Sequence, residues 1–158
     1  MRLMEIAVWS LGAGVMLAII FACGQALGLT RLDIPFILGT MFTSDRDRAK
    51  LLGHGLNLVA AAAFGAIYVL FFEIHGHSGL LYGLGLGLIH GLFVLMIFVP
   101  LLPGVHPRMV SDARGPEPTR LLQPPGFFAV NYGRHTPWVT LAAHVAFGAI
   151  IGTLYTPR

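Results

Sequence analysis

The sequence predicts an all-α polytopic membrane protein in which four transmembrane helices form a bundle. Hydrophobic residues make up 56% of the 158 residues and charged residues only 11%, which is too few polar side chains to cover a water-soluble domain of this length. Four apolar stretches are long enough to cross a hydrocarbon core of about 30 Å, which takes roughly 20 helical residues. They lie near 6–28, 50–72, 79–101 and 137–155. We therefore expect a single transmembrane domain, 1–158.

Local signals predict where these helices begin and end. The second helix follows TSDRDRAK, in which Ser44 is the expected N-cap and Asp47 would complete a capping box. Pro100 and Pro103 are expected to end the third helix. Pro137 suits the first turn of the fourth helix. Two further apolar segments, 32–42 and 121–136, are expected to lie at the membrane interface.

A short internal match raises the question of duplication. AFGAIYVLFF, residues 63–72, and AFGAIIGTLY, residues 146–155, share Ala, Phe, Gly, Ala and Ile in register. Each block ends the second helix of a predicted pair. A duplicated helix pair would explain the match, and chance among common membrane residues would explain it as well.

The positive charges predict an orientation. Eight of the ten Lys and Arg residues lie in or beside the two long connections, and the other two are terminal. The short turn EIHGHS between the second and third helices has neither. The positive-inside rule then puts the long connections in the cytoplasm and both termini outside. The ten cations form no single dense patch, so we expect no nucleic-acid partner.

Glycines recur at every fourth position of the third helix, where they would weaken a helix in water. Helices in lipid associate through close van der Waals contact, which small residues at this spacing allow. We expect the third helix to pack on a small-residue face of the fourth, and both to meet the face formed by Asn57, Ala61 and Gly65 on the second. The predicted packing residues are Gly79, Gly83, Gly87, Gly91, Gly148 and Gly152.

Three histidines lie within the predicted spans, one in each of the last three helices. His90 shares a helix face with Gly83 and Gly87, and His144 lies within its own small-residue face. His54 precedes Asn57 by one turn. We expect all three rings to point inward, because an ionisable group in the membrane is costly unless it is paired or functional. His54, Asn57, His90 and His144 therefore form the candidate cofactor or proton site.

Three functions remain open for these rings. Neutral histidines that bond across helices favour a non-enzymatic accessory or structural subunit of a membrane assembly. A haem b or metal site would use imidazoles of the third and fourth helices as ligands, with the metal unspecified. A proton or small-solute path would use the three rings in sequence. No catalytic motif points to an enzyme.

Two groups of residues in the connections could also bind ligands. Glu73, His75 and His77 lie together in the EIHGHS turn and offer at most three ligands to zinc or copper. The other group is expected at the cytoplasmic face, against lipid phosphates or a partner subunit. It consists of His106, Arg108, Arg134 and His135.

The order of these motifs resembles a family of small bacterial four-helix integral membrane proteins to which no activity is assigned. The resemblance rests on LDIPFILGTMF, GHGLNLVAAAAFGAIY, GLGLGLIHGLFVLMIFVP and TLAAHVAFGAIIGTLY, in that order. It implies a multi-pass protein of the bacterial inner membrane and no particular chemistry. The expected partners are the lipid bilayer and other membrane subunits or further copies of the chain.

Overall fold

The computed structural model describes residues 2–111, 114–120 and 122–158, and these residues form helices and connections without a β-strand. The helices are α1 (Arg2–Ala26), α2 (Ile34–Thr40), α3 (Arg46–His75), α4 (Leu80–Phe93), η1 (Val94–Phe98), α5 (Val99–Val105), η2 (Phe127–Tyr132) and α6 (Thr136–Leu154). Four helical segments are long and apolar enough to cross a membrane: Met4–Ala26, Arg46–His75, Leu80–Val105 and Thr136–Leu154. The prediction of a four-helix membrane bundle is confirmed.

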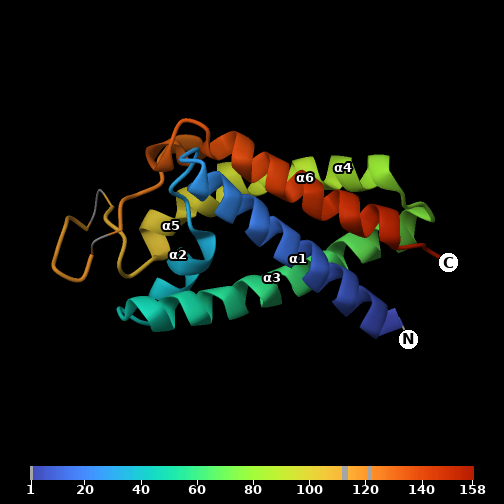
Figure 1. The fold of residues 1–158 in the computed structure, drawn as a ribbon, viewed down its shortest axis with the longest axis horizontal. Helices are drawn as coiled ribbons and strands as arrows, with labels where there is room; N and C mark the ends of the chain where they lie inside the picture. Colours follow the sequence, from blue (N-terminus) through green and yellow to red (C-terminus); the bar gives the residue numbers. More distant parts are fainter. Residues whose placement is uncertain (1, 112–113, 121) are drawn as a thin grey trace.

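Helix α1 crosses the bundle between α3 on one side and α6 on the other (Figure 1). Helix α4 lies alongside α6, and the short α2 lies against the first half of α3. Both chain ends lie at the same end of the molecule as the α3–α4 turn, and the long connections lie at the opposite end. Helix α3 packs on α1 and α2, whereas its backbone stays apart from those of α4, η1 and α5 and meets α4 through side chains.

The N-terminus of α3 differs from the prediction by one residue. The N-cap is Asp45, not Ser44, and its carboxylate accepts a hydrogen bond of 2.8 Å from the Arg48 N–H. Carboxylate and hydroxyl side chains cap helices equally well, so the sequence could not separate two adjacent candidates. At the other end Gly76 takes the left-handed conformation, with φ 66°, which closes α3 as a C-cap.

Pro100 and Pro103 do not end the third span, which continues to Val105. Before them η1 forms a π-helical turn, in which the Val99 N–H bonds to the Val94 carbonyl five residues back. A proline removes one helical hydrogen bond and crowds the carbonyl of the preceding turn. In a transmembrane helix a π turn can rearrange the neighbouring bonds, so the helix continues through a proline that would stop it in water.

Helices α4 and α6 approach until their backbones touch. A Cβ atom added to Gly83 would lie 2.2 Å from the Gly148 carbonyl oxygen, and one added to Gly87 would lie 2.5 Å from the His144 carbonyl oxygen. The Gly79 N–H also donates to the Gly152 carbonyl at 2.7 Å. No side chain larger than hydrogen fits at these glycines unless the helices separate.

The small face of α3 contacts α1 and not the α4–α6 pair, which corrects the expectation that the three faces meet. A Cβ added to Gly65 would lie 1.8 Å from Ser10 Oγ, and one added to Gly14 would lie 2.5 Å from the Ala61 Cβ. The small faces of α4 and α6 already cover each other, so α3 needs another partner. Gly65 and Gly148 hold matching positions in the two AFGAI blocks, and each contacts the first helix of its own pair.

The 32–42 segment is built into the protein as α2. The Asp33 carboxylate caps it by accepting a hydrogen bond of 2.9 Å from the Phe36 N–H. An added Cβ on Gly39 would lie 1.7 Å from the Ala49 carbonyl oxygen, and one on Gly53 would lie 1.7 Å from the Pro35 carbonyl oxygen. Helix α2 is therefore a closely packed cover on α3.

Candidate functional site

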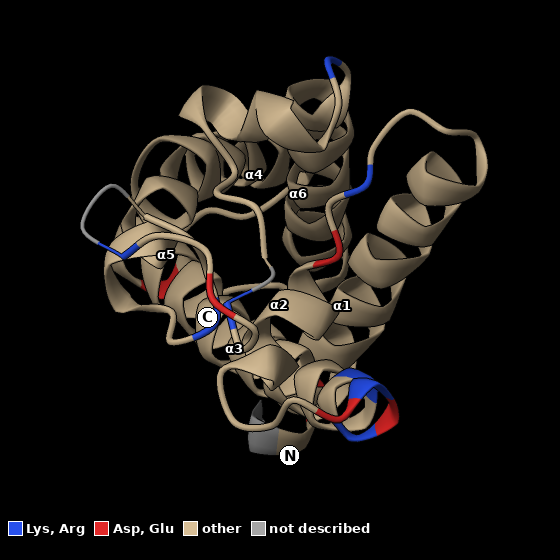
Figure 2. Ribbon diagram, turned by 90° about the vertical axis from the view of Figure 1, so that its left-hand side faces the viewer, with Lys and Arg blue, Asp and Glu red and all other residues tan. Residues whose placement is uncertain are grey.

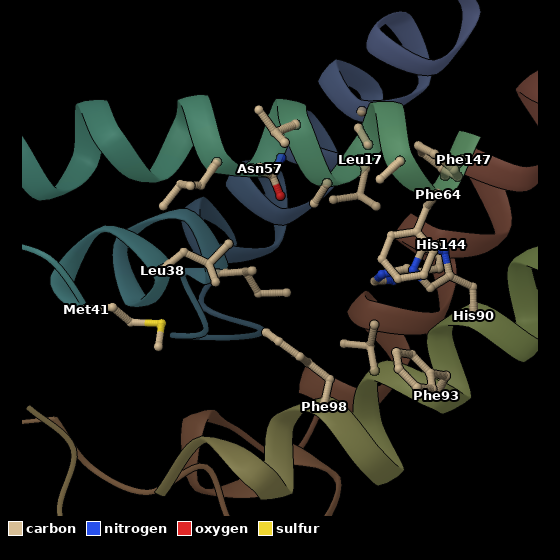
Figure 3. A pocket seen from close by; sticks show the side chains of 18 of the residues that line it. Leu17, Leu38, Met41, Asn57, Phe64, His90, Phe93, Phe98, His144 and Phe147 are labelled. Carbon is tan, nitrogen blue, oxygen red and sulfur yellow. The ribbon is translucent and has the colours of Figure 1, made fainter. Parts of the chain in front are cut away.

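A cleft of about 380 Å³ lies between α3 and the α4–η1 segment, where the backbones of the two spans stay apart (Figure 3). Helix α2 closes one end with Leu38 and Met41, and α1 contributes Gly14 and Leu17 to the back wall. Phenylalanines dominate the remaining wall: Phe42, Phe64, Phe93, Phe98 and Phe147. The lining contains no Lys, Arg, Asp or Glu, so the cleft offers no charge to an occupant.

The rings of His90 and His144 meet at the α6 end of this cleft. Their centroids lie 4.6 Å apart with 77° between the ring planes, an edge-to-face contact. His90 is 9% exposed and His144 is 4% exposed. Phe64 stacks on the His90 ring at 3.9 Å, so the phenylalanine of the first AFGAI block forms part of the histidine site. The glycine contacts of α4 with α6 bring the two rings together.

Hydrogen bonds determine which nitrogens carry protons. His144 Nδ1 lies 2.7 Å from the Thr140 carbonyl, which can only accept, so Nδ1 carries the proton and Nε2 is an acceptor. His90 Nδ1 lies 3.3 Å from the Tyr68 hydroxyl, which has no other acceptor among the described residues. Assigned from this network, the Tyr68 O–H donates to Nδ1 and the His90 proton is on Nε2. Nε2 of His144 is thus a hydrogen-bond acceptor, and the Nε2–H of His90 is a donor.

Neither Nε2 atom has a hydrogen-bond partner among the described residues. Within the same residues, Ser10 Oγ is the one side-chain polar atom that is both completely buried and unpartnered. The Nε2 atoms are therefore not sealed off, and both histidines line the cleft. A molecule in the cleft can reach nitrogens that protein groups leave free.

Asn57 supplies a third polar group on the α3 wall of the cleft (Figure 3). Its amide makes no hydrogen bond to any described residue and its side chain is half-buried. Asn57 precedes Phe64 by seven residues, so it lies roughly 10 Å along the α3 axis from the ring that stacks on His90. The cleft therefore has polar groups at two separated positions and an apolar wall between them.

His54 is not part of the site, which corrects the expectation that its ring points inward. Its side chain is exposed, and its Nδ1 donates to the Lys50 carbonyl one turn back at 2.7 Å. The neighbouring Gly53 faces α2. Successive residues of an α-helix are about 100° apart, so His54 is turned away from that contact. His90, His144 and Asn57 line one cleft, but no ladder of three rings exists.

The histidine pair does not fit the expected bis-histidine haem. Two axial ligands must approach the iron from opposite faces of the macrocycle. Rings in edge-to-face contact at 4.6 Å leave no room for a flat macrocycle between them. Metal binding by several ligands finds no support either, because no three His, Cys, Asp or Glu side chains of the described residues are grouped to hold an ion.

The two groups in the connections are separate from the cleft. In the α3–α4 turn the Tyr155 hydroxyl donates to Glu73, while His75 and His77 are exposed and bond to the carbonyls of Phe71 and His75. At the opposite end the side chains of Arg134 and His135 bond to each other at 2.9 Å. They share no hydrogen bond with His106 or Arg108 in the described part of the chain. The four residues predicted at the cytoplasmic face thus form two pairs.

His106 is completely buried, and it connects α2 to the segment after α5. Its Nε2 lies 2.9 Å from the Ile37 carbonyl, which makes Nε2 the donor, and Nδ1 accepts a hydrogen bond of 3.1 Å from the Arg108 N–H. The Arg108 guanidinium donates to the Thr40 carbonyl at 2.6 Å. Burial lowers the pKa of His106, and the positive charge of Arg108 acts in the same direction. This neutral histidine holds the cover of the cleft in place.

Sequence reasoning missed Phe64, Tyr68 and the role of His106. A signal for the first two was present, because they are one turn apart on the α3 face that carries Ala61. Comparison of the chain with protein families, with curated proteins and with solved structures finds no match in any of the three. The resemblance to a family of bacterial four-helix membrane proteins therefore stays a prediction.

Proposed function

We propose that this protein is a non-catalytic accessory subunit of the bacterial inner membrane that binds an uncharged, lipid-soluble small molecule between α3 and α4–η1. One observation carries the proposal. The imidazole rings of His90 and His144 are each at least nine-tenths buried and lie at one end of an apolar cleft. Their Nε2 atoms have no hydrogen-bond partner among the described residues.

Inside a membrane, a nitrogen without a hydrogen-bond partner is energetically unfavourable. Hydrocarbon offers no hydrogen bonds, so polar groups in a span are paired, hydrated or functional. A cleft of about 380 Å³ is within the range of small-molecule sites, and its lining is predominantly apolar with a few polar groups, as such sites are. Its mouth lies between two spans, so we expect the occupant to enter from the lipid.

The orientation is proposed from the charges. Figure 2 looks onto the end that carries the long connections, where the charged residues lie on loops and on the first turn of α3. We place this end in the cytoplasm and both termini outside, as the positive-inside rule requires. Helix α2 would then cover the cytoplasmic half of the cleft.

Glycines on the outer surface support an accessory role beside other helices. Gly12, Gly55 and Gly85 are exposed on three different spans, and a Cβ at each would meet no atom within 4 Å. Such positions let the backbone of a neighbouring span approach closely, in a second copy or in another subunit. Cross-linking in native membranes followed by purification would identify that neighbour.

The binding function is tested by extracting what the protein carries. Purified in native lipid discs, the wild type should yield a lipophilic compound in stoichiometric amount by solvent extraction and mass spectrometry. Ala60→Phe should lose it, because Ala60 lines the cleft and the larger ring fills it. Ala66→Phe is the matched control, since Ala66 is exposed on the same helix and does not line the cleft. Equal extracts from wild type and Ala60→Phe would refute the proposal.

The other two functions receive less support. The bis-histidine haem conflicts with the contact between the His90 and His144 rings. A proton path through three histidines lacks its His54 step, because that ring lies outside the bundle. The binding proposal uses only groups that share one cleft.

A further inference from the structure

The geometry points to the chemistry of the occupant: an uncharged aromatic molecule with a hydroxyl group on its ring, a phenol-type head with an apolar tail. This inference rests on the proposed binding function and adds the class of ligand. The hydroxyl would bind between the Nε2 atoms of His144 and His90, and the tail would extend along the cleft toward α2.

The free donor and acceptor of the two histidines favour a hydroxyl group on the ligand. The Nδ1 proton of His144 is committed to the Thr140 carbonyl at 2.7 Å, so its Nε2 needs a donor from the ligand. His90, whose Nδ1 accepts from Tyr68, offers an N–H from Nε2. A hydroxyl both donates and accepts, so one such group satisfies both rings. A ketone, ester or ether only accepts and would leave His144 Nε2 unpaired.

The absence of charge in the lining excludes charged heads. No Lys, Arg, Asp or Glu lines the cleft, so nothing there would compensate a carboxylate, phosphate or ammonium group. Fatty acids and phospholipid headgroups are therefore unsuitable occupants of the histidine end. An uncharged hydroxyl avoids that penalty.

The walls favour a flat ring. Phe64 stacks on His90 at 3.9 Å, and Phe93, Phe98 and Phe147 also line the cleft. Aromatic rings gain from edge-to-face and offset contacts beyond their buried area. A cleft of about 380 Å³ corresponds to roughly a dozen water volumes at about 30 Å³ each, enough for a substituted ring and the first part of a tail.

The test uses three probes: a phenol, its methyl ether, which has no hydroxyl donor, and a cyclohexanol, which has no aromatic ring. Lipid discs with and without the protein are equilibrated with 4-octylphenol or with its methyl ether, 4-octylanisole, and binding in excess of the empty discs is measured by dialysis. The phenol should bind at least about tenfold more tightly than the ether, because the ether cannot donate to His144. 4-Octylcyclohexanol, which keeps the hydroxyl and lacks the aromatic ring, should bind more weakly than the phenol.

Two variants test whether the preference for the phenol over the ether depends on the histidine pair. His144→Ala should remove the difference between phenol and ether, while His54→Ala should retain it, because His54 is exposed and outside the cleft. Should His144→Ala fail to fold, the wild-type comparison of the three probes still decides. Equal binding of phenol and ether would overturn the hydroxyl inference, and equal binding of phenol and cyclohexanol would overturn the aromatic one, with the binding function left standing. No excess binding of any probe, together with empty extracts from the native discs, would overturn both proposals.

Discussion

Replacing Gly83 with alanine should destabilise the bundle, because its missing side chain is what lets α4 reach α6. The added Cβ would lie 2.2 Å from the Gly148 carbonyl oxygen and 3.1 Å from the Gly152 Cα. Ordinary contacts begin near 3.4 Å, so the helices must separate by about 1 Å along most of their contact. Overpacking of this kind costs about 1–3 kcal/mol. Gly85→Ala is the matched control, since Gly85 is exposed and a Cβ there would meet nothing within 4 Å.

Both variants gain the same helix propensity from the change of glycine to alanine, about 1 kcal/mol at most. Any difference between them therefore reports the contact with α6. Unfolding in mixed detergent micelles, followed by far-ultraviolet circular dichroism, should show Gly83→Ala less stable than Gly85→Ala by at least about 1 kcal/mol. Equal stability of the two variants would refute the backbone contact between α4 and α6.

Two further predictions concern the ends of the bundle. Asp45→Ala should lower stability by about 1 kcal/mol and Ser44→Ala by much less, because Asp45 caps α3; the reverse order in the same unfolding assay would contradict this assignment. His106 is kept neutral by burial, so its pKa lies below the ordinary 6.5 and the unfolded chain binds its proton first as the pH falls. The free energy of unfolding should therefore not depend on His106 above about pH 6.5 and should decline below that pH. The variant His106→Gln should show a shallower decline, whereas the control His54→Ala should decline as the wild type does. An unchanged pH profile for His106→Gln would show that this histidine does not couple α2 to pH.

The spans were predictable because they depend on local properties. Length and apolar composition are read directly along the chain, and they identified all four membrane-length helices. The ends were harder to predict. Asp45 and Ser44 are chemically equivalent caps, and Pro100 is tolerated only because η1 rearranges the preceding hydrogen bonds. Such choices depend on competition between neighbours and not on the identity of one residue.

The site was only partly predictable, because it depends on which helices meet. His90 and His144 belong to helices whose small faces match, and the spacing of their glycines predicted that the two rings share a side. His54 follows a similar spacing but lies where α2 takes the neighbouring face. Tyr68 becomes relevant only through its bond to His90, a contact 22 residues away along the chain. The periodicity of the sequence predicts which residues share one face of a helix, but it does not predict which other helix that face contacts.

The packing of the bundle and the presence of the cleft have a common physical origin. Helix α4 commits its glycine face to α6, where a Cβ on Gly87 would lie 2.5 Å from the His144 carbonyl oxygen, and this contact brings the two imidazoles together. On α3, Gly65 packs against α1 and Gly53 packs against α2. Between α3 and α4 the cleft is lined by large side chains such as Phe64 and Phe93, which keep the two backbones apart. The same glycines that hold the helices together therefore leave an apolar opening that ends at the histidine pair.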